Sequence, residues 1–368
     1  MGSARAPGMA GQARGAGKIA YLIEPRFSGG TSAAVAAELA VARGAAGQVR
    51  VHGFRARMFA ERPPAPVLED RLDRLGLPLD WDSAVIRGDL VILHNPSFLK
   101  FDGAFARRIV ARHLVLVTHE NFLRPGGAEA FDVAHCLGLI DRASFALRKT
   151  HAPVSAHNRE TVATWLDSRQ RRADRAGGWR MLDDDWFNIC DTDLIAPVAR
   201  PRDRRGRLSR PSAEKFPALA DLDLCFPPGA ECNLLLGADG LAEAARTRPH
   251  WTLYPFNGLA PAEFYDRIDF MVHFVAPTWS ESFGRVLAEA VAAGKVVISD
   301  ARTAAMLPGA VIAARPDEVD AVIARHVADP DLYQGQVRSA QARLAAYSPA
   351  RFADLLGQVL ADRPGGGA

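Results

Sequence analysis

Hydrophobic and polar residues alternate along this chain in blocks that differ in period. Short runs rich in aliphatic and β-branched residues occur in the first half at 18–24, 48–54, 89–95, 113–121 and 152–155. Similar runs occur in the second half at 232–238, 250–256, 270–275, 295–300 and 310–314. Amphipathic helical patterns cover about 32–44, 155–166, 261–267, 284–293 and 316–328. Strand-like runs separated by helical patterns predict βαβ units built around parallel sheets.

A change of composition divides the chain. The stretch 171–186 is charged and irregular, and 195–212 holds three prolines with six arginines between 200 and 210. Such a composition is typical of a linker between domains, with most of its arginines on a solvated face. We therefore predict an α/β protein with two Rossmann-like parallel-sheet domains, at 18–194 and 195–347, facing a central cleft. A disordered lead-in at 1–17 precedes them, and a C-terminal helix and tail at 348–368 follow.

Length and composition narrow the class of protein. A chain of 368 residues is long enough for two domains, and 48% hydrophobic with 24% charged residues is typical of a globular protein. A net charge of +3 gives no reason to expect a nucleic-acid partner. No apolar run approaches the ~20 residues that a membrane span needs. We expect a cytoplasmic protein, and peripheral contact with the inner membrane face stays open, as does the oligomeric state.

The cysteines do not form a recognisable site. None of the four shows the paired C-x2-C spacing of a zinc site, and they are too few for a disulfide scaffold. We read them as reduced thiols: Cys136, Cys190, Cys225 and Cys232.

The stretch "APTWSESFGRVLAEAVAAGKVVISD", at 276–300, carries the most chemistry. It predicts a helix that begins near Gly284, whose free backbone N–H groups and dipole favour a phosphate. Ser282 and Phe283 stand at this helix start, where a glycine allows close approach. Glu281 borders the same turn, and Glu289 lies over it one helical turn deeper. Two glutamates eight residues apart are common by chance. The order of strand, proline, turn, helix, glycine and strand around them favours a functional pair that accepts hydrogen bonds from sugar hydroxyls.

These residues resemble the E-x7-E signature of retaining glycosyltransferases with the GT-B fold, the group called glycosyltransferase family 4. The resemblance covers most of residues 18–345. It implies that Glu281 contacts the donor sugar, that Glu289 contacts the nucleotide ribose, and that the backbone at Phe283 and Gly284 holds phosphate. It also implies that Arg207 and Lys215, in "RGRLSRPSAEKFP", contact the diphosphate, although their spacing is longer than usual.

The resemblance is weaker in the first half. It implies a glycine-rich cleft loop, matched by Gly29 and Gly30, and a histidine near the reacting sugar, matched by His119 in "VTHENF". Glu120 and His94 are weaker candidates for the same pocket. The usual Asn-Gly-Val-Asp entry to the linker is absent, and "WFNICDTDLIAP" at 186–197 stands in its place. Relatives also carry the last helix back onto the first domain. The remaining polar candidates are read as structural or exposed: His52, His135, His250, His326, Arg204, Arg205 and Arg210.

The implied function is transfer of a sugar from a nucleotide-diphosphate donor to a hydroxyl on a glycan, lipid-linked or small-molecule acceptor, with retention of configuration. Arg, Lys and helix N-termini would neutralise the diphosphate, so no metal and no cofactor is expected. A metal-dependent transferase would need a D-x-D pair, for which only the chance-level triplets at 191–193 and 221–223 are present. A nicotinamide enzyme lacks its G-x-G-x-x-G turn. A sugar epimerase and a catalytically inactive nucleotide-sugar or protein-binding module remain as alternatives.

Overall fold

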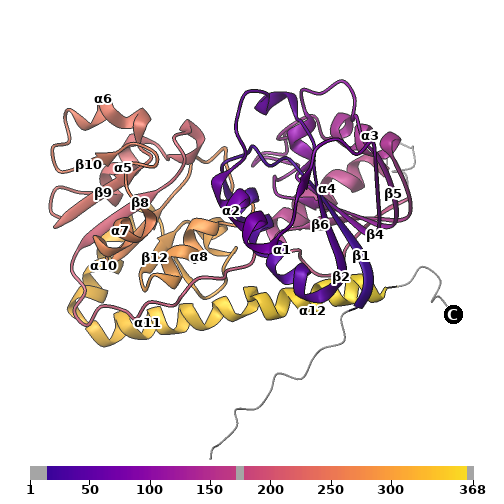
Figure 1. The fold of residues 1–368 in the computed structure, drawn as a ribbon. Coiled ribbons are helices and arrows are strands. Elements are labelled where there is room, and N and C mark those ends of the chain that lie inside the picture. The colour runs from indigo at the N-terminus through magenta and orange to yellow at the C-terminus, as the bar shows by residue number, and fades with distance from the viewer. Residues whose placement is uncertain (1–14, 171–177, 363–368) are drawn as a thin grey trace, which may run out of the picture.

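The computed structural model describes residues 15–170 and 178–362 and contains two α/β domains (Figure 1). The first is built on a seven-stranded sheet in the order β3-β2-β1-β4-β5-β6-β7, and the second on a six-stranded sheet in the order β10-β9-β8-β11-β12-β13. Every pair of neighbouring strands in both sheets is parallel. The predicted fold class of two parallel-sheet domains is confirmed.

The first domain alternates strands with helices. Its strands are β1 (Gly15–Ile23), β2 (Ala46–Gly53), β3 (Leu79–Asp80), β4 (Val85–His94), β5 (Arg108–Thr118), β6 (Ser144–Pro153) and β7 (Trp179–Met181). Its helices are α1 (Gly30–Ala45), α2 (Pro66–Leu75), α3 (Val133–Ala143) and α4 (Ala156–Gln170), with short 3-10 turns η1 (Arg57–Phe59) and η2 (Pro96–Leu99). Along β1, Tyr21 belongs to the core on one face of the sheet and Leu22 to the core on the other. Both faces are therefore covered, which explains why the central strands are continuously apolar.

The second domain follows the same plan. Its strands are β8 (Arg204–Leu208), β9 (Cys232–Leu236), β10 (Thr252–Tyr254), β11 (Phe270–His273), β12 (Val296–Ser299) and β13 (Val311–Ala313). Its helices are α5 (Leu219–Cys225), α6 (Ala242–Ala245), α7 (Pro261–Asp266), α8 (Arg285–Ala292), α9 (Ala301–Ala304), α10 (Val319–Ala328) and α11 (Pro330–Arg343). Four 3-10 turns accompany them: η3 (Ala213–Lys215), η4 (Asp239–Leu241), η5 (Pro316–Glu318) and η6 (Leu344–Tyr347).

The prediction of a solvated linker over 195–212 is wrong in its second half. Residues 204–208 form β8, a central strand of the second sheet between β9 and β11. Arg205 is 2% exposed and pairs with Asp203 and Asp320, and Arg204 pairs with the buried Asp269. A strand whose arginines are held by ion pairs carries no hydrophobic pattern, so composition alone mistakes it for a linker.

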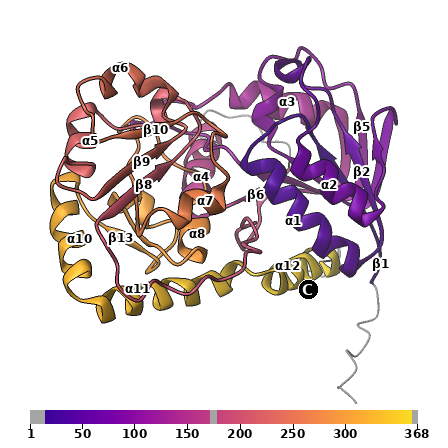
Figure 2. The ribbon, with the colours of Figure 1, turned by 60° about the vertical axis from the view of Figure 1, so that its left-hand side comes forward.

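The last helix, α12 (Pro349–Ala361), packs on the first domain although it follows the second in sequence. Phe352 and Leu356 are fully buried in the same core cluster as residues of α1 and β1. The ring of Phe352 also meets that of Trp186, with centroids 5.1 Å apart. Figures 1 and 2 show α11 and α12 following one another along one side of both domains.

Parts of the predicted organisation fall outside the described residues. Most of the expected lead-in, residues 1–14, lies there, and 15–17 belong to β1. Residues 171–177 of the charged stretch and 363–368 of the tail also lie outside the described residues. Within the described ranges, no helix is both long and apolar enough to span a membrane.

Candidate functional site

A cavity of about 500 Å³ lies between the two domains, where the carboxyl ends of both sets of strands meet. The loops after β1, β4 and β5 line it from the first domain, and the loops after β8 and β11 line it from the second. Parallel α/β sheets bind ligands in this position because loops from several strands converge there. The predicted cleft is therefore present and holds side chains from both domains.

The start of α8 forms part of the cavity wall, on the side of the second domain that faces the first (Figure 1). Gly284 caps the helix with φ of 74°, a left-handed conformation that disfavours other residues. A Cβ at this position would also lie 2.9 Å from Leu287 Cδ1. Ser282, Phe283 and Gly284 all line the cavity, with Phe283 packed edge-on against Tyr347 at 5.4 Å. The wall therefore presents free N–H groups at a helix N-terminus.

Polar side chains of the first domain bind the loop that precedes α8. Asn121 Nδ2 donates to the Ser280 carbonyl at 3.1 Å, and His157 Nε2 lies 2.8 Å from Ser280 Oγ. Ser155 donates from Oγ to the carbonyl of Ser282. These contacts join residues more than 120 positions apart and hold the two domains against the same loop. Sequence reasoning missed them, because no local pattern marks a hydrogen bond between domains.

Glu281 and Lys215 form a buried ion pair on the cavity wall. Lys215 Nζ lies 2.6 Å and 2.7 Å from the two carboxylate oxygens, and the side chains are 9% and 14% exposed. Nζ also lies 4.8 Å from the centre of the Trp279 ring. Burial raises the pKa of Glu281, but the Lys215 ammonium and the nearby His273 outweigh this and hold the pKa well below its usual range. The carboxylate is therefore charged at neutral pH and can accept hydrogen bonds from a ligand.

Two further residues lie behind this pair. His273 Nε2 is 3.6 Å from Glu281 Oε1, and burial, followed by the nearby Arg207, lowers the pKa of His273 to about 4. Arg207 is fully buried, donates to the Lys215 carbonyl, and lies over the ring of Phe216 at 4.7 Å. Burial lowers the pKa of Arg207 to about 10, so it stays charged at neutral pH. Its Nε and Nη1 have no hydrogen-bond partner among the described residues. The sequence analysis did not identify His273 as a site residue. Arg207 was expected to contact the diphosphate, but it does not line the cavity.

Glu289 does not line the cavity either. Its carboxylate accepts a hydrogen bond of 2.8 Å from Arg285 Nε, one helical turn back, and Arg285 is on the wall. The helical spacing correctly predicts the Arg285–Glu289 pair, but Ser282 precedes Gly284 and lies outside α8, so the predicted column does not extend to it. The link of Glu289 to the cavity runs through Arg285.

His119 lines the cavity and ends a chain of buried groups. Its Nε2 lies 2.9 Å from His94 Nδ1, and His94 Nε2 lies 3.4 Å from Glu38 Oε2. Trp186 donates from its indole N–H to the same Glu38 oxygen at 3.0 Å. Burial, together with His94, lowers the pKa of His119 well below its usual value. A carboxylate only accepts, so it favours the proton on His94 Nε2, which leaves Nδ1 to accept from His119.

Glu38, His94 and His119 are also the one group of three metal-ligating side chains, within 15–170 and 178–362, whose donor atoms lie within 4.8 Å of one another. His94 turns one nitrogen to Glu38 and the other to His119. The three donor atoms are thus close enough together to hold a cation. The contacts of His94 with His119 and with Glu38 also form a relay that orients the His119 ring.

The remaining candidates differ in position. Gly30 lines the cavity, whereas Gly29 does not, and a Cβ on Gly29 would meet the Phe27 ring at 2.6 Å. Glu120 and Arg210 both line the cavity.

Several solved structures resemble this two-domain architecture over nearly the whole chain. HepE of Anabaena in complex with UDP-glucose matches with a TM-score of 0.64 and 17% identity over 94% of this chain and 99% of that chain. An E. coli structure described as trehalose-6-phosphate bound with UDP-2-fluoro glucose matches with a TM-score of 0.59 and 11% identity over 94% and 99%. The lipopolysaccharide outer core galactosyltransferase WaaB matches with 0.55 and 13% over 93% and 99%. No family model and no curated protein matches the sequence. At these identities the similarity is one of fold, and the chain has the GT-B fold.

Proposed function

We propose that this protein is a glycosyltransferase that moves a sugar from a nucleotide-diphosphate donor to a hydroxyl acceptor, with retention of configuration and without a metal. The observation that carries the proposal is the Lys215–Glu281 pair at the start of α8, inside the cavity between two GT-B domains. Solved structures of the same fold hold UDP and glucose, or UDP-glucose. The E-x7-E resemblance supports the same assignment.

The second domain would bind the donor. Lys215 and the backbone N–H groups at Gly284 and Arg285 supply positive charge for the diphosphate, and the buried Arg207 adds to the potential behind them. In the structure Lys215 bonds both oxygens of Glu281, so a bound phosphate would share the ammonium with the carboxylate. Glu281 would then turn an oxygen to a hydroxyl of the donor sugar. We propose that Glu289 contacts the ribose, with Arg285 as its present partner.

The first domain would bind the acceptor. His119 faces the cavity from the end of β5, opposite the start of α8. As a neutral imidazole held by His94, it can accept a hydrogen bond from a hydroxyl near the reacting carbon.

A thermal-shift panel of UDP-, GDP- and ADP-sugars tests donor binding. A ligand at a hundred times its dissociation constant stabilises the protein by about 2.7 kcal/mol. We expect one nucleotide series to raise Tm in wild type and much less in Lys215→Met. Lys295→Met, which removes another buried lysine of the second domain outside the cavity, should respond like wild type.

Turnover separates an enzyme from a binding module. Release of the nucleoside diphosphate, followed with the stabilising donor in the presence of a chelator, should continue in wild type and fall in Glu281→Ala. Tight donor binding with no hydrolysis and no transfer would favour the inactive module. Loss of activity in the chelator would favour a metal-dependent enzyme.

A further inference from the structure

Four basic side chains line the cavity with no carboxylate in ion-pair contact among the residues that the structure describes. They are Arg62, Lys100, Arg124 and Arg210. Each lies over an aromatic ring instead: Arg62 over Phe59 at 5.6 Å, Lys100 over Phe101 at 5.5 Å, Arg124 over Trp279 at 5.1 Å and Arg210 over Phe27 at 5.8 Å. A cation resting on a ring keeps N–H groups free to bind an anion.

Three of these cations belong to the first domain and come from three different loops. Arg62 follows β2 and η1, Lys100 follows β4 and η2, and Arg124 follows β5. Lys100 and Arg124 are half-buried and Arg62 is exposed. Glu120 is the one acidic side chain that the described part of this domain adds to the cavity wall. The first-domain wall therefore carries an excess of positive charge.

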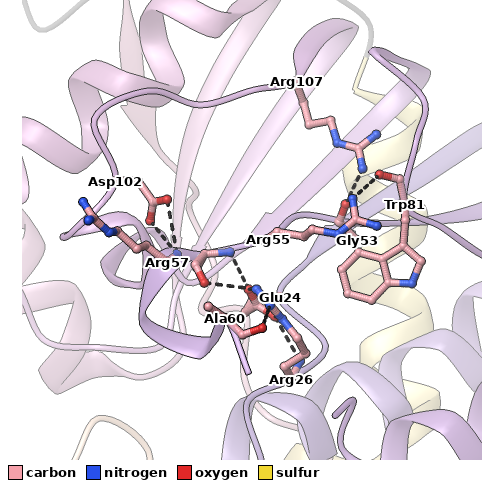
Figure 3. Close-up of polar contacts among 10 residues, drawn as sticks. Glu24, Arg26, Gly53, Arg55, Arg57, Ala60, Trp81, Asp102 and Arg107 are labelled. Carbon is pink, nitrogen blue, oxygen red and sulfur yellow. Dashed lines mark hydrogen bonds and ion pairs between the residues drawn. The ribbon is translucent and has the colours of Figure 1, made fainter. Parts of the chain in front are cut away.

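This wall is built in advance by a buried network (Figure 3). Glu24, 3% exposed, accepts 2.6 Å hydrogen bonds from Arg26 Nη2 and from the N–H of Ala56. Arg26 returns a bond of 3.0 Å to the Ala56 carbonyl. Asp102 accepts from the N–H of Arg57 at 3.2 Å, which joins the loop of Lys100 to the loop of Arg62 (Figure 3). The buried Glu24–Arg26 pair thus holds the loop of Arg62, and the exposed Asp102 contact ties the loop of Lys100 to it, so less ordering is left for a ligand to induce.

The donor diphosphate does not account for these cations. The second domain already supplies Lys215, Arg285 and the start of α8; Arg124 shares the Trp279 ring with Lys215, whereas Arg62 and Lys100 lie over rings of the first domain. Beside Arg62, the rings of Phe27, Phe59 and Phe98 form a cluster with centroids 5.0–5.8 Å apart, and all three line the cavity. The first-domain wall thus combines an apolar floor with unpaired cations.

We propose that this wall, formed by Arg62, Lys100, Arg124 and the three phenylalanines, binds an anionic group of the acceptor, so that the acceptor is a hydroxyl compound carrying a phosphate or a carboxylate. This inference rests on the proposed function. A soluble sugar phosphate and the headgroup of an anionic lipid share this chemistry.

Matched pairs of probes test the wall by direct binding. Calorimetry compares glucose 6-phosphate with glucose, and glucuronate with glucose, on the full chain with and without the stabilising donor. Sedimentation compares vesicles of phosphatidylcholine with and without phosphatidylinositol. We expect at least one anionic member to bind about tenfold more tightly than its neutral partner, as one charge-assisted contact allows. Soluble phosphate binding without vesicle binding identifies a soluble acceptor, and the reverse identifies a lipid.

Variants locate the binding. Arg62→Gln and Lys100→Gln should each weaken the preferred anionic probe about tenfold and leave the donor-induced Tm shift unchanged. Arg55→Gln is the matched control, because Arg55 lies over the Trp81 ring at 4.7 Å in the same domain but does not line the cavity. Equal binding of charged and neutral members, or equal binding by wild type and both variants, overturns this inference alone. Absence of any donor-induced shift in wild type overturns the proposed function instead.

Discussion

Replacing Lys215 with methionine removes the ammonium from the buried pair while keeping most of the side-chain volume. The carboxylate of Glu281 would be left 14% exposed without its nearest cation. Removing one member of a buried ion pair costs about 3–5 kcal/mol. His273 at 3.6 Å and the charged Arg207 remain close to the carboxylate, so we expect the lower end, about 3 kcal/mol.

Urea denaturation measures this loss. With a slope of about 2 kcal/mol per molar, the midpoint of the second-domain transition should fall by about 1.5 M in Lys215→Met. Lys295→Met serves as control, because Lys295 is 6% exposed and has no ion pair within the described ranges. It should shift the midpoint far less.

A double-mutant cycle shows whether the loss comes from the pair. In Lys215→Met with Glu281→Gln, both charges are gone, so the double variant should be more stable than Lys215→Met alone. The reasoning is refuted if Lys215→Met is as stable as Lys295→Met, or if the two substitutions add without coupling.

The remaining predictions concern pH and catalysis. Because the folded pKa of Glu281 is depressed, the stability that the Glu281 carboxylate contributes is present above its unfolded pKa of about 4.3 and is lost as pH falls through the folded value. The difference in unfolding free energy between wild type and Glu281→Gln should therefore be constant above about pH 5 and shrink below about pH 4. A difference that grows in acid would contradict the assignment. His94→Phe should lower the transfer rate about a hundredfold and leave the donor-induced Tm shift unchanged. His151→Phe, which alters another buried histidine of the same sheet, should transfer at nearly the wild-type rate. Equal transfer rates in the two variants would remove the role given to the relay. Glu289→Ala should weaken donor affinity about tenfold, whereas Glu281→Ala should lower turnover more than affinity, and calorimetry with steady-state kinetics separates the two.

Local patterns predicted the parts of the fold whose residues face an apolar core. Both sheets are marked by β-branched runs because their central strands are buried on two faces. The hydrophobic pattern did not predict β8, because Arg205 is buried there through charge pairing and Arg207 through ring contact. The helices α2 and α3 were not singled out either.

The same limit applies to the site. The turn at Gly284 is encoded locally by a glycine before a helical pattern, and it was predicted. His273 and Asn121 act only because the fold carries them to Glu281 and Ser280, which no spacing in the sequence reveals. Glu38 sits inside an apolar helix and finds its partners, His94 and Trp186, far along the chain.

A crystal structure with the nucleoside diphosphate selected by the thermal-shift panel tests the central claim most directly. We predict its phosphates within hydrogen-bond reach of Lys215 Nζ and of the N–H groups at Gly284 and Arg285. Phosphates bound on the first-domain wall at Arg62 and Lys100, or outside the cavity, would contradict the account.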